Sequence, residues 1–164
     1  MPLLDRAPVE KKSVIDKHLD KVPVPVGLIA RELGLEVKLV VLPPNISGEI
    51  RPSSTARAGY RININRHEKK ERQRFTIAHE IGHYLLHSHL IGAGVSDSVM
   101  YRSGLPSAQE TEANKIAAEI LMPSGSIENL LELYEGVRSE TTANAIAEAL
   151  DVSTPAVKIR LGII

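Results

Sequence analysis

Two histidines and a glutamate stand at a spacing that suits metal chemistry. The run His79-Glu80-Ile81-Gly82-His83 has the form H-E-x-x-H. On an α-helix, residues i and i+4 lie one above the other, so His79 and His83 can both reach one tetrahedral Zn²⁺ ion. Glu80 can then reach a water molecule at the metal and act as general base. The motif therefore predicts a hydrolytic zinc site, with Mn²⁺ as the alternative ion.

Two further histidines are candidates for the third protein ligand of such an ion. His87 continues the i+4 series, but eight residues of helix rise about 12 Å, so His79 and His87 cannot share one ion. His89 stands where the pattern H-E-x-x-H-x-x-G-x-x-H has its third histidine. That pattern needs a glycine at the turn, and this chain has Leu86 there. His89 is therefore the weaker candidate.

Carboxylates on the next expected helix are the remaining candidates. Ser107 and Glu110 form a capping box, which already gives Glu110 a structural task. Glu112 lies beside Ala113, at the margin of the apolar stripe, where its carboxylate can point inward. Glu119 lies two turns further along nearly the same face. Spacing alone favours Glu112 over Glu110 only modestly, and Glu119 remains a neighbouring or rim charge.

The surrounding pattern predicts the elements that position these side chains. A helix is expected from Asn65 to about His87, with a charged first half and an apolar, buried second half. Strands are expected over 36–42, 46–51 and 59–65; the last alternates cleanly, which favours an edge strand that a substrate segment could extend. The Gly- and Ser-rich stretch 88–106 predicts a long loop over the cleft.

Composition bounds the class of protein. The chain has 164 residues, 43% hydrophobic and 24% charged, which is typical of one globular domain. It has no cysteine, which excludes Cys-ligated zinc and a thiol nucleophile. It has no apolar run of about 18 residues, and residues 1–12 lack the apolar region of a signal peptide. We therefore expect a cytoplasmic protein with no membrane partner.

The end of the chain suggests a rival function. Residues 146–157 resemble a helix-turn-helix, the fold of many DNA-binding regulators. Residues 140–164 nevertheless carry three acidic and two basic side chains, whereas a phosphate-reading module should be clearly positive. Direct nucleic-acid binding is therefore not expected. The alternative to an enzyme is a DNA-binding or partner-binding regulator that uses the same fold without catalysis.

Two stretches together resemble the ImmA/IrrE family of zinc metallo-endopeptidases. Residues 72–87, RQRFTIAHEIGHYLLH, resemble the central helix of that family, and residues 112–123, EANKIAAEILMP, resemble its second signature. The resemblance covers roughly residues 22–161. It implies an α+β fold in which a small gluzincin-like mixed sheet packs on the zinc helix. We therefore expect one metalloprotease domain over 1–164, with a catalytic core at 22–123 and helices at 124–164.

The resemblance also implies a site and a substrate. It assigns zinc to His79, His83 and Glu112, and it implies that the substrate is a helix-turn-helix transcriptional repressor or an antitoxin. The residue that stabilises the oxyanion is not readable from the sequence. The candidates for that role, or for a supporting contact to the ligands, are Asn114, Glu119, Tyr101 and His87, with Arg102 and His89 as further loop candidates.

Overall fold

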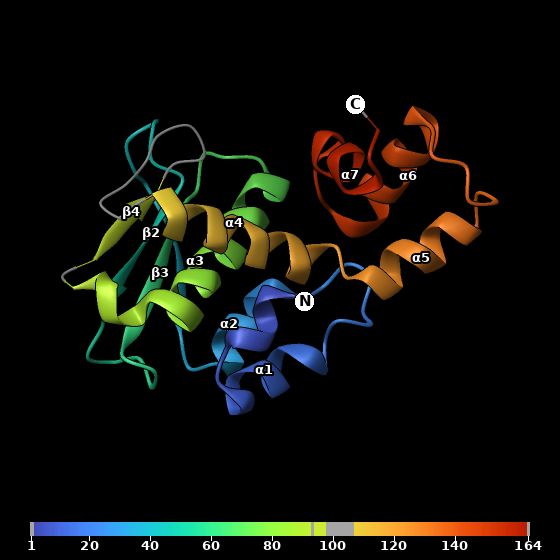
Figure 1. Cartoon of the computed structure of the whole chain (residues 1–164). Coiled ribbons are helices and arrows are strands. Elements are labelled where there is room, and N and C mark those ends of the chain that lie inside the picture. The colour runs from blue at the N-terminus through green and yellow to red at the C-terminus, as the bar shows by residue number, and fades with distance from the viewer. Residues whose placement is uncertain (1, 93, 98–106, 164) are drawn as a thin grey trace.

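The computed structural model describes residues 2–92, 94–97 and 107–163 (Figure 1). A small sheet lies at one end of the molecule, two long helices cross its middle, and a group of C-terminal helices forms the other end. Within the described residues the elements are η1 (Leu3–Arg6), α1 (Val9–Asp16), α2 (Val26–Glu32), β1 (Glu36–Val40), β2 (Gly48–Pro52), β3 (Tyr60–Asn65), α3 (Lys70–Ile91), β4 (Val95–Asp97), α4 (Ser107–Leu121), α5 (Ser124–Glu132), α6 (Glu140–Leu150) and α7 (Thr154–Leu161). The predicted α+β class is confirmed.

The sheet is mixed and has the strand order β1-β3-β2-β4 among the described residues. Strand β1 runs parallel to β3, and β2 runs antiparallel to both β3 and β4. Ile50 and Ile62 face each other across β2 and β3, and both are fully buried, as is Ile64. These three isoleucines form the apolar floor on which α3 packs.

The expectation that 59–65 forms an edge strand is wrong. Strand β3 is central, with β1 on one side and β2 on the other. Its polar face misled the prediction because Asn63 is buried and donates from Nδ2 to Oε2 of Glu49 at 2.7 Å. A polar residue that pairs with its neighbouring strand has the same sequence pattern as one that faces water. Within the described part of the sheet, a peptide strand can be added only at β1 or β4.

Helix α3 carries the H-E-x-x-H motif across the sheet. It begins at Lys70, five residues later than predicted, because the side chain of Asn65 holds the preceding turn. Asn65 donates to the carbonyl of Ile46 at 2.9 Å and accepts from the backbone N–H of His67 at 3.2 Å. The helix departs from regular geometry at His87 and then continues to Ile91.

The predicted loop at 88–106 is therefore only partly correct. Residues 88–91 belong to the last turn of α3, and residues 95–97 form the short strand β4. Residues 93 and 98–106 lie outside the described part of the chain.

Helix α4 lies against α3, and the N-terminal segment is attached to α4. The backbone N–H groups of Leu3 and Leu4 donate to the two carboxylate oxygens of Glu119 at 2.8 and 2.9 Å. In the same segment, the ammonium of Lys11 lies 4.2 Å from the ring centre of Tyr84 on α3. The segment before α2 is thus held across both site-bearing helices.

The C-terminal helices form as predicted, and serines cap two of them. Ser139 accepts from the backbone N–H of Thr142 at the start of α6, and Ser153 accepts from that of Ala156 at the start of α7. That the α6–α7 pair acts as a helix-turn-helix stays a prediction.

Across residues 2–92, 94–97 and 107–163, no helix has both the length and the apolar character needed to cross a bilayer.

Candidate metal centre

The two histidines of the motif lie one helical turn apart on the buried side of α3. His79 is 6% exposed and His83 is fully buried. Their ring centres are 4.6 Å apart and the ring planes stand nearly perpendicular, at 87°. Phe75, one turn earlier, stacks on the ring of His79 with centroids 6.2 Å apart. The stacking of Phe75 thus holds the ring of His79 in place.

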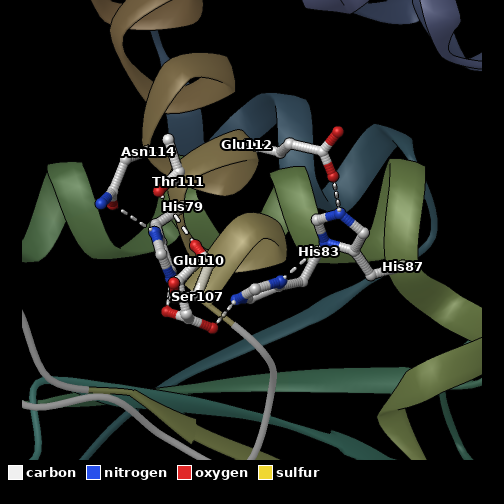
Figure 2. Close-up of polar contacts among 8 residues, drawn as sticks. All are labelled: His79, His83, His87, Ser107, Glu110, Thr111, Glu112 and Asn114. Carbon is white, nitrogen blue, oxygen red and sulfur yellow. Dashed lines mark hydrogen bonds and ion pairs between the residues drawn. The ribbon is translucent and has the colours of Figure 1, made fainter.

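The first turns of α4 bring a carboxylate to this pair (Figure 2). Oε2 of Glu110 lies 3.3 Å from Nε2 of His79, and Oε1 lies 2.9 Å from Nε2 of His83. All three residues are buried, and one donor atom from each lies within 4.8 Å of the others. Two imidazole nitrogens and a carboxylate thereby converge on one point.

The structure places Glu110 beside the two histidines, whereas the sequence favoured Glu112 for that position. Positions i and i+2 of a helix are separated by about 200° around its axis. The side chains of Glu110 and Glu112 therefore face nearly opposite ways. Glu110 shares the buried stripe of α4 with Ala113, Ala117 and Ile120. This i, i+3, i+7, i+10 series is visible in the sequence and would have identified Glu110.

Glu112 lies one step away from the cluster and holds a third histidine. Its Oε1 accepts from Nε2 of His87 at 2.8 Å, and its Oε2 accepts from Nη1 of Arg6 at 2.7 Å. Nδ1 of His87 lies 3.0 Å from Nδ1 of His83. Figure 2 shows His87 between Glu112 and the ring of His83. The contact from Arg6 extends this series toward the N-terminal segment.

Two pKa shifts accompany this arrangement. Burial is the main cause that lowers the pKa of His87 below its ordinary value, so the ring is held neutral. Hydrogen bonds from His87 and then from Arg6 lower the pKa of the Glu112 carboxyl, which therefore stays ionised.

Asn114 supports the other histidine. Its Oδ1 lies 2.8 Å from Nδ1 of His79. An amide oxygen only accepts, so Nδ1 of His79 donates to Asn114, and Nε2 is the ring nitrogen that faces Glu110. Both histidines thus have a polar partner behind the ring and a carboxylate in front of it.

Among the described residues, two of the other candidates lie away from the cluster. Glu119 binds the N-terminal backbone instead, and His89 is exposed near the end of α3. Tyr101 and Arg102 lie outside the described residues. Glu80, next to His79, is fully buried.

An H-E-x-x-H helix over a small mixed sheet, with a carboxylate from the following helix, is the arrangement of metallopeptidases that use two histidines and a glutamate. The IrrE N-terminal-like domain model matches residues 36–162, and the chain belongs to that family. The radiation response metalloprotease IrrE of Deinococcus radiodurans is 36% identical over 104 residues. That match covers 57% of this chain and 31% of the relative, so the chain spans less than a third of its length. The predicted resemblance to the ImmA/IrrE family is confirmed.

Proposed function

We propose that this chain is a zinc-dependent endopeptidase whose metal is held by Nε2 of His79, Nε2 of His83 and the carboxylate of Glu110. The convergence of these three donors within 4.8 Å carries the proposal. The assignment replaces Glu112 with Glu110 as the third ligand. Mn²⁺ remains the alternative ion.

The donor set fits a catalytic zinc ion. Two imidazoles and one carboxylate are a recurrent catalytic set that leaves the fourth position for water or substrate. Bond lengths of about 2.0–2.2 Å in a tetrahedron place ligand atoms roughly 3.3 Å apart. The nitrogen–oxygen distances of 3.3 and 2.9 Å from Glu110 to His79 and His83 are close to that value. Asn114 also places the proton of His79 on the nitrogen that faces away from the cluster.

The mechanism assigns one step to each group. Zinc, when bound, supplies a Lewis acid that polarises the scissile carbonyl and makes water a better nucleophile. Glu80 takes a proton as the water oxygen forms its bond to the carbonyl carbon. Glu80 then gives that proton to the amine nitrogen as the carbon–nitrogen bond breaks, so that a carboxyl and an amino terminus result. The fully buried position of Glu80, adjacent to His79, supports this role.

Metal content tests the ligand assignment. Plasma mass spectrometry on purified protein supplied with zinc should find about one zinc per chain in the wild type. At saturating zinc, Glu110→Ala should lose the ion, because the site then keeps only two protein ligands. Under the same condition Glu112→Ala and His89→Ala should still hold about one zinc per chain, whatever their affinity. Loss of zinc in Glu112→Ala with retention in Glu110→Ala would contradict the assignment.

Activity is tested with a peptide library prepared from a bacterial proteome. Zinc-loaded wild type should generate new peptide N-termini that mass spectrometry identifies. Glu80→Gln should keep its zinc and generate none, because the amide cannot accept the proton. Cleavage by Glu80→Gln at the wild-type rate would contradict the mechanism. Full zinc occupancy with no cleavage of peptides or repressors would favour a partner-binding regulator.

The family resemblance supports a helix-turn-helix transcriptional repressor or antitoxin as the protein substrate and a cytoplasmic location. We further propose that residues 22–123 form the catalytic core and that residues 124–164 dock the partner. Purified helix-turn-helix repressors, compared with unrelated proteins of equal size, test the substrate: the repressors should be cleaved at one or a few bonds. Equal cleavage of both sets would contradict repressor specificity while leaving the peptidase intact.

A further inference from the structure

We propose that His87 and Glu112 are positioning residues that set the tautomer and the orientation of the metal ligand His83. The proposal rests on the proposed metal centre and adds a second layer of side chains to it. Three links carry it: Arg6 to Glu112, Glu112 to His87, and His87 to His83.

The direction of each hydrogen bond follows from the two ends of this series of contacts. A metal bound at Nε2 of His83 would leave the one proton of that ring on Nδ1. His83 would then donate across the 3.0 Å contact between the two Nδ1 atoms, and Nδ1 of His87 would accept. At the other end a carboxylate only accepts, so Glu112 receives the Nε2–H of His87 across 2.8 Å.

This direction prepares His83 to bind a cation. With its proton on Nδ1, His83 presents the lone pair of Nε2 toward Glu110, the side on which the metal donors converge. The opposite direction would put the proton on Nε2 and block coordination. Ligating histidines commonly donate their other N–H to a fixed acceptor, and here that acceptor is a second histidine.

The geometry of α3 is consistent with this role. The helix departs from regular dihedral angles at His87 itself, with φ −128° and ψ 17°. Its side chain is buried at 3% exposure, whereas Glu112 is 25% exposed and is approached from outside by Arg6. The series therefore runs from the N-terminal segment at the surface to the buried centre. His79 needs no such series because Asn114 accepts from it directly.

The tautomer of His87 is measured directly in zinc-loaded protein. Two-bond proton–nitrogen NMR spectra at about pH 8, above the ordinary histidine pKa of about 6.5, distinguish Nδ1–H from Nε2–H rings. The expected wild-type result is Nε2–H for His87, so that its Nδ1 accepts from His83. Nδ1–H on His87 would overturn the proposal.

Zinc affinity is the second readout, measured by competition with a chromophoric chelator. His87→Phe keeps a ring of similar size and removes both nitrogens, so the Nδ1–H preference of His83 should be lost. Zinc affinity should then fall about 10–100-fold. His87→Asn can offer an amide oxygen to the Nδ1–H of His83, and we expect it to recover part of that loss.

Substitutions at His87 could disturb folding, so a matched pair of truncations on α4 provides an independent test. Glu112→Ala and Glu119→Ala remove the same group from the same helix, and both glutamates hold the N-terminal segment. Only Glu112 contacts a histidine of the series, so Glu112→Ala should weaken zinc binding by about tenfold or more and Glu119→Ala by much less. Equal losses in the two variants would mean that the effect comes from the N-terminal segment, which overturns the proposal.

The outcomes separate this inference from the metal centre itself. If the wild type binds zinc and the variants His87→Phe and Glu112→Ala bind it with the same affinity, the inference is overturned and the proposed function stands. A wild type with no affinity for zinc or manganese would overturn both. Cobalt absorption spectra give a third check, because a reoriented His83 should change the ligand-field bands in His87→Phe but not in Glu119→Ala.

Discussion

Gly82 of α3 lies directly against Ala113 of α4. A Cβ at Gly82 would come within 3.1 Å of the Ala113 Cα, 3.2 Å of its carbonyl oxygen and 3.2 Å of the Cβ of Ile116. The two helices therefore approach closely at the centre of the H-E-x-x-H motif. This approach holds Glu110 next to the histidines of α3, so the spacing of two backbones sets the geometry of the candidate metal centre.

Gly82→Ala should destabilise the protein and weaken metal binding together. Helix propensity alone would gain about 1 kcal/mol, but overpacking costs about 1–3 kcal/mol, so we expect a net loss of up to about 2 kcal/mol. Urea denaturation and zinc competition measure the two effects. Gly125→Ala, in a helix where the new Cβ meets nothing within 4 Å, is the matched control and should be neutral or stabilising. A stabilising Gly82→Ala with unchanged zinc affinity would contradict the close-packing argument.

Asn114 should contribute to zinc affinity without touching the metal. Asn114→Ala removes the acceptor at 2.8 Å from Nδ1 of His79, and we expect zinc to bind about tenfold more weakly. Asn114→Asp keeps an accepting oxygen and should bind zinc at least as tightly as the wild type. Lys115→Ala, the next exposed position of α4, controls for truncation of that surface. Similar affinities for all three variants would exclude a role for Asn114 in holding His79.

Local patterns in the sequence predicted the part of the site that depends on local structure. The i, i+4 rule places His79 and His83 together on any regular helix, and the apolar stretch 75–86 correctly indicated that this half of α3 is buried. Which carboxylate joins the two histidines depends on which face of a second helix, α4, points toward α3. Glu110 has the spacing of a capping-box residue, but it also shares the buried stripe of α4 with Ala113 and Ala117, and that stripe faces α3.

Long-range pairing was harder to predict. Strand β3 pairs in parallel with β1 and antiparallel with β2. The sequence of residues 59–65 does not reveal that this strand has a neighbour on each side. The contact between His87 and Glu112 joins residues 25 apart on two helices. The sequence offers both residues as candidates but does not link them, because their contact exists only after α3 and α4 pack.

Arg74 should be important for holding the C-terminal helices on the core. Its guanidinium donates to the carbonyls of Val24 at 2.9 Å, Asp151 at 3.3 Å and Leu150 at 3.4 Å. Two of these carbonyls terminate α6, where a cation is also favoured by the helix dipole. Arg74→Met keeps the aliphatic stem and should cost about 1.5–3 kcal/mol of stability, because hydrogen bonds to a charged group are lost.

Urea denaturation followed by circular dichroism measures that loss, and hydrogen exchange should show faster opening of α6 and α7. Arg72→Met, at an exposed position on the same helix, is the control and should change stability by less than about 0.5 kcal/mol. Equal effects of the two substitutions would show that the three carbonyl contacts contribute nothing measurable.

Glu36, the first residue of β1, should make the free energy of unfolding depend on pH. Its carboxylate accepts from the hydroxyls of Ser53 and Thr55, each at 2.6 Å, which ties β1 to the loop between β2 and β3. The hydrogen bond from Ser53 is the main cause that lowers the pKa of this carboxyl below its ordinary value of 4.5. A carboxyl whose pKa is lower in the folded state contributes stability above the unfolded pKa and loses it as the pH falls through the folded pKa.

Glu36→Gln should therefore be less stable than the wild type at neutral pH, and the gap should close as the pH falls below the lowered pKa of Glu36. Chemical denaturation at a series of pH values between neutral and about 3 measures the gap. Glu128→Gln, an exposed carboxylate of α5, controls for loss of a charge and should show a smaller gap at neutral pH. A gap for Glu36→Gln that stays constant or widens in acid would show that the hydroxyl contacts do not favour the ionised carboxylate.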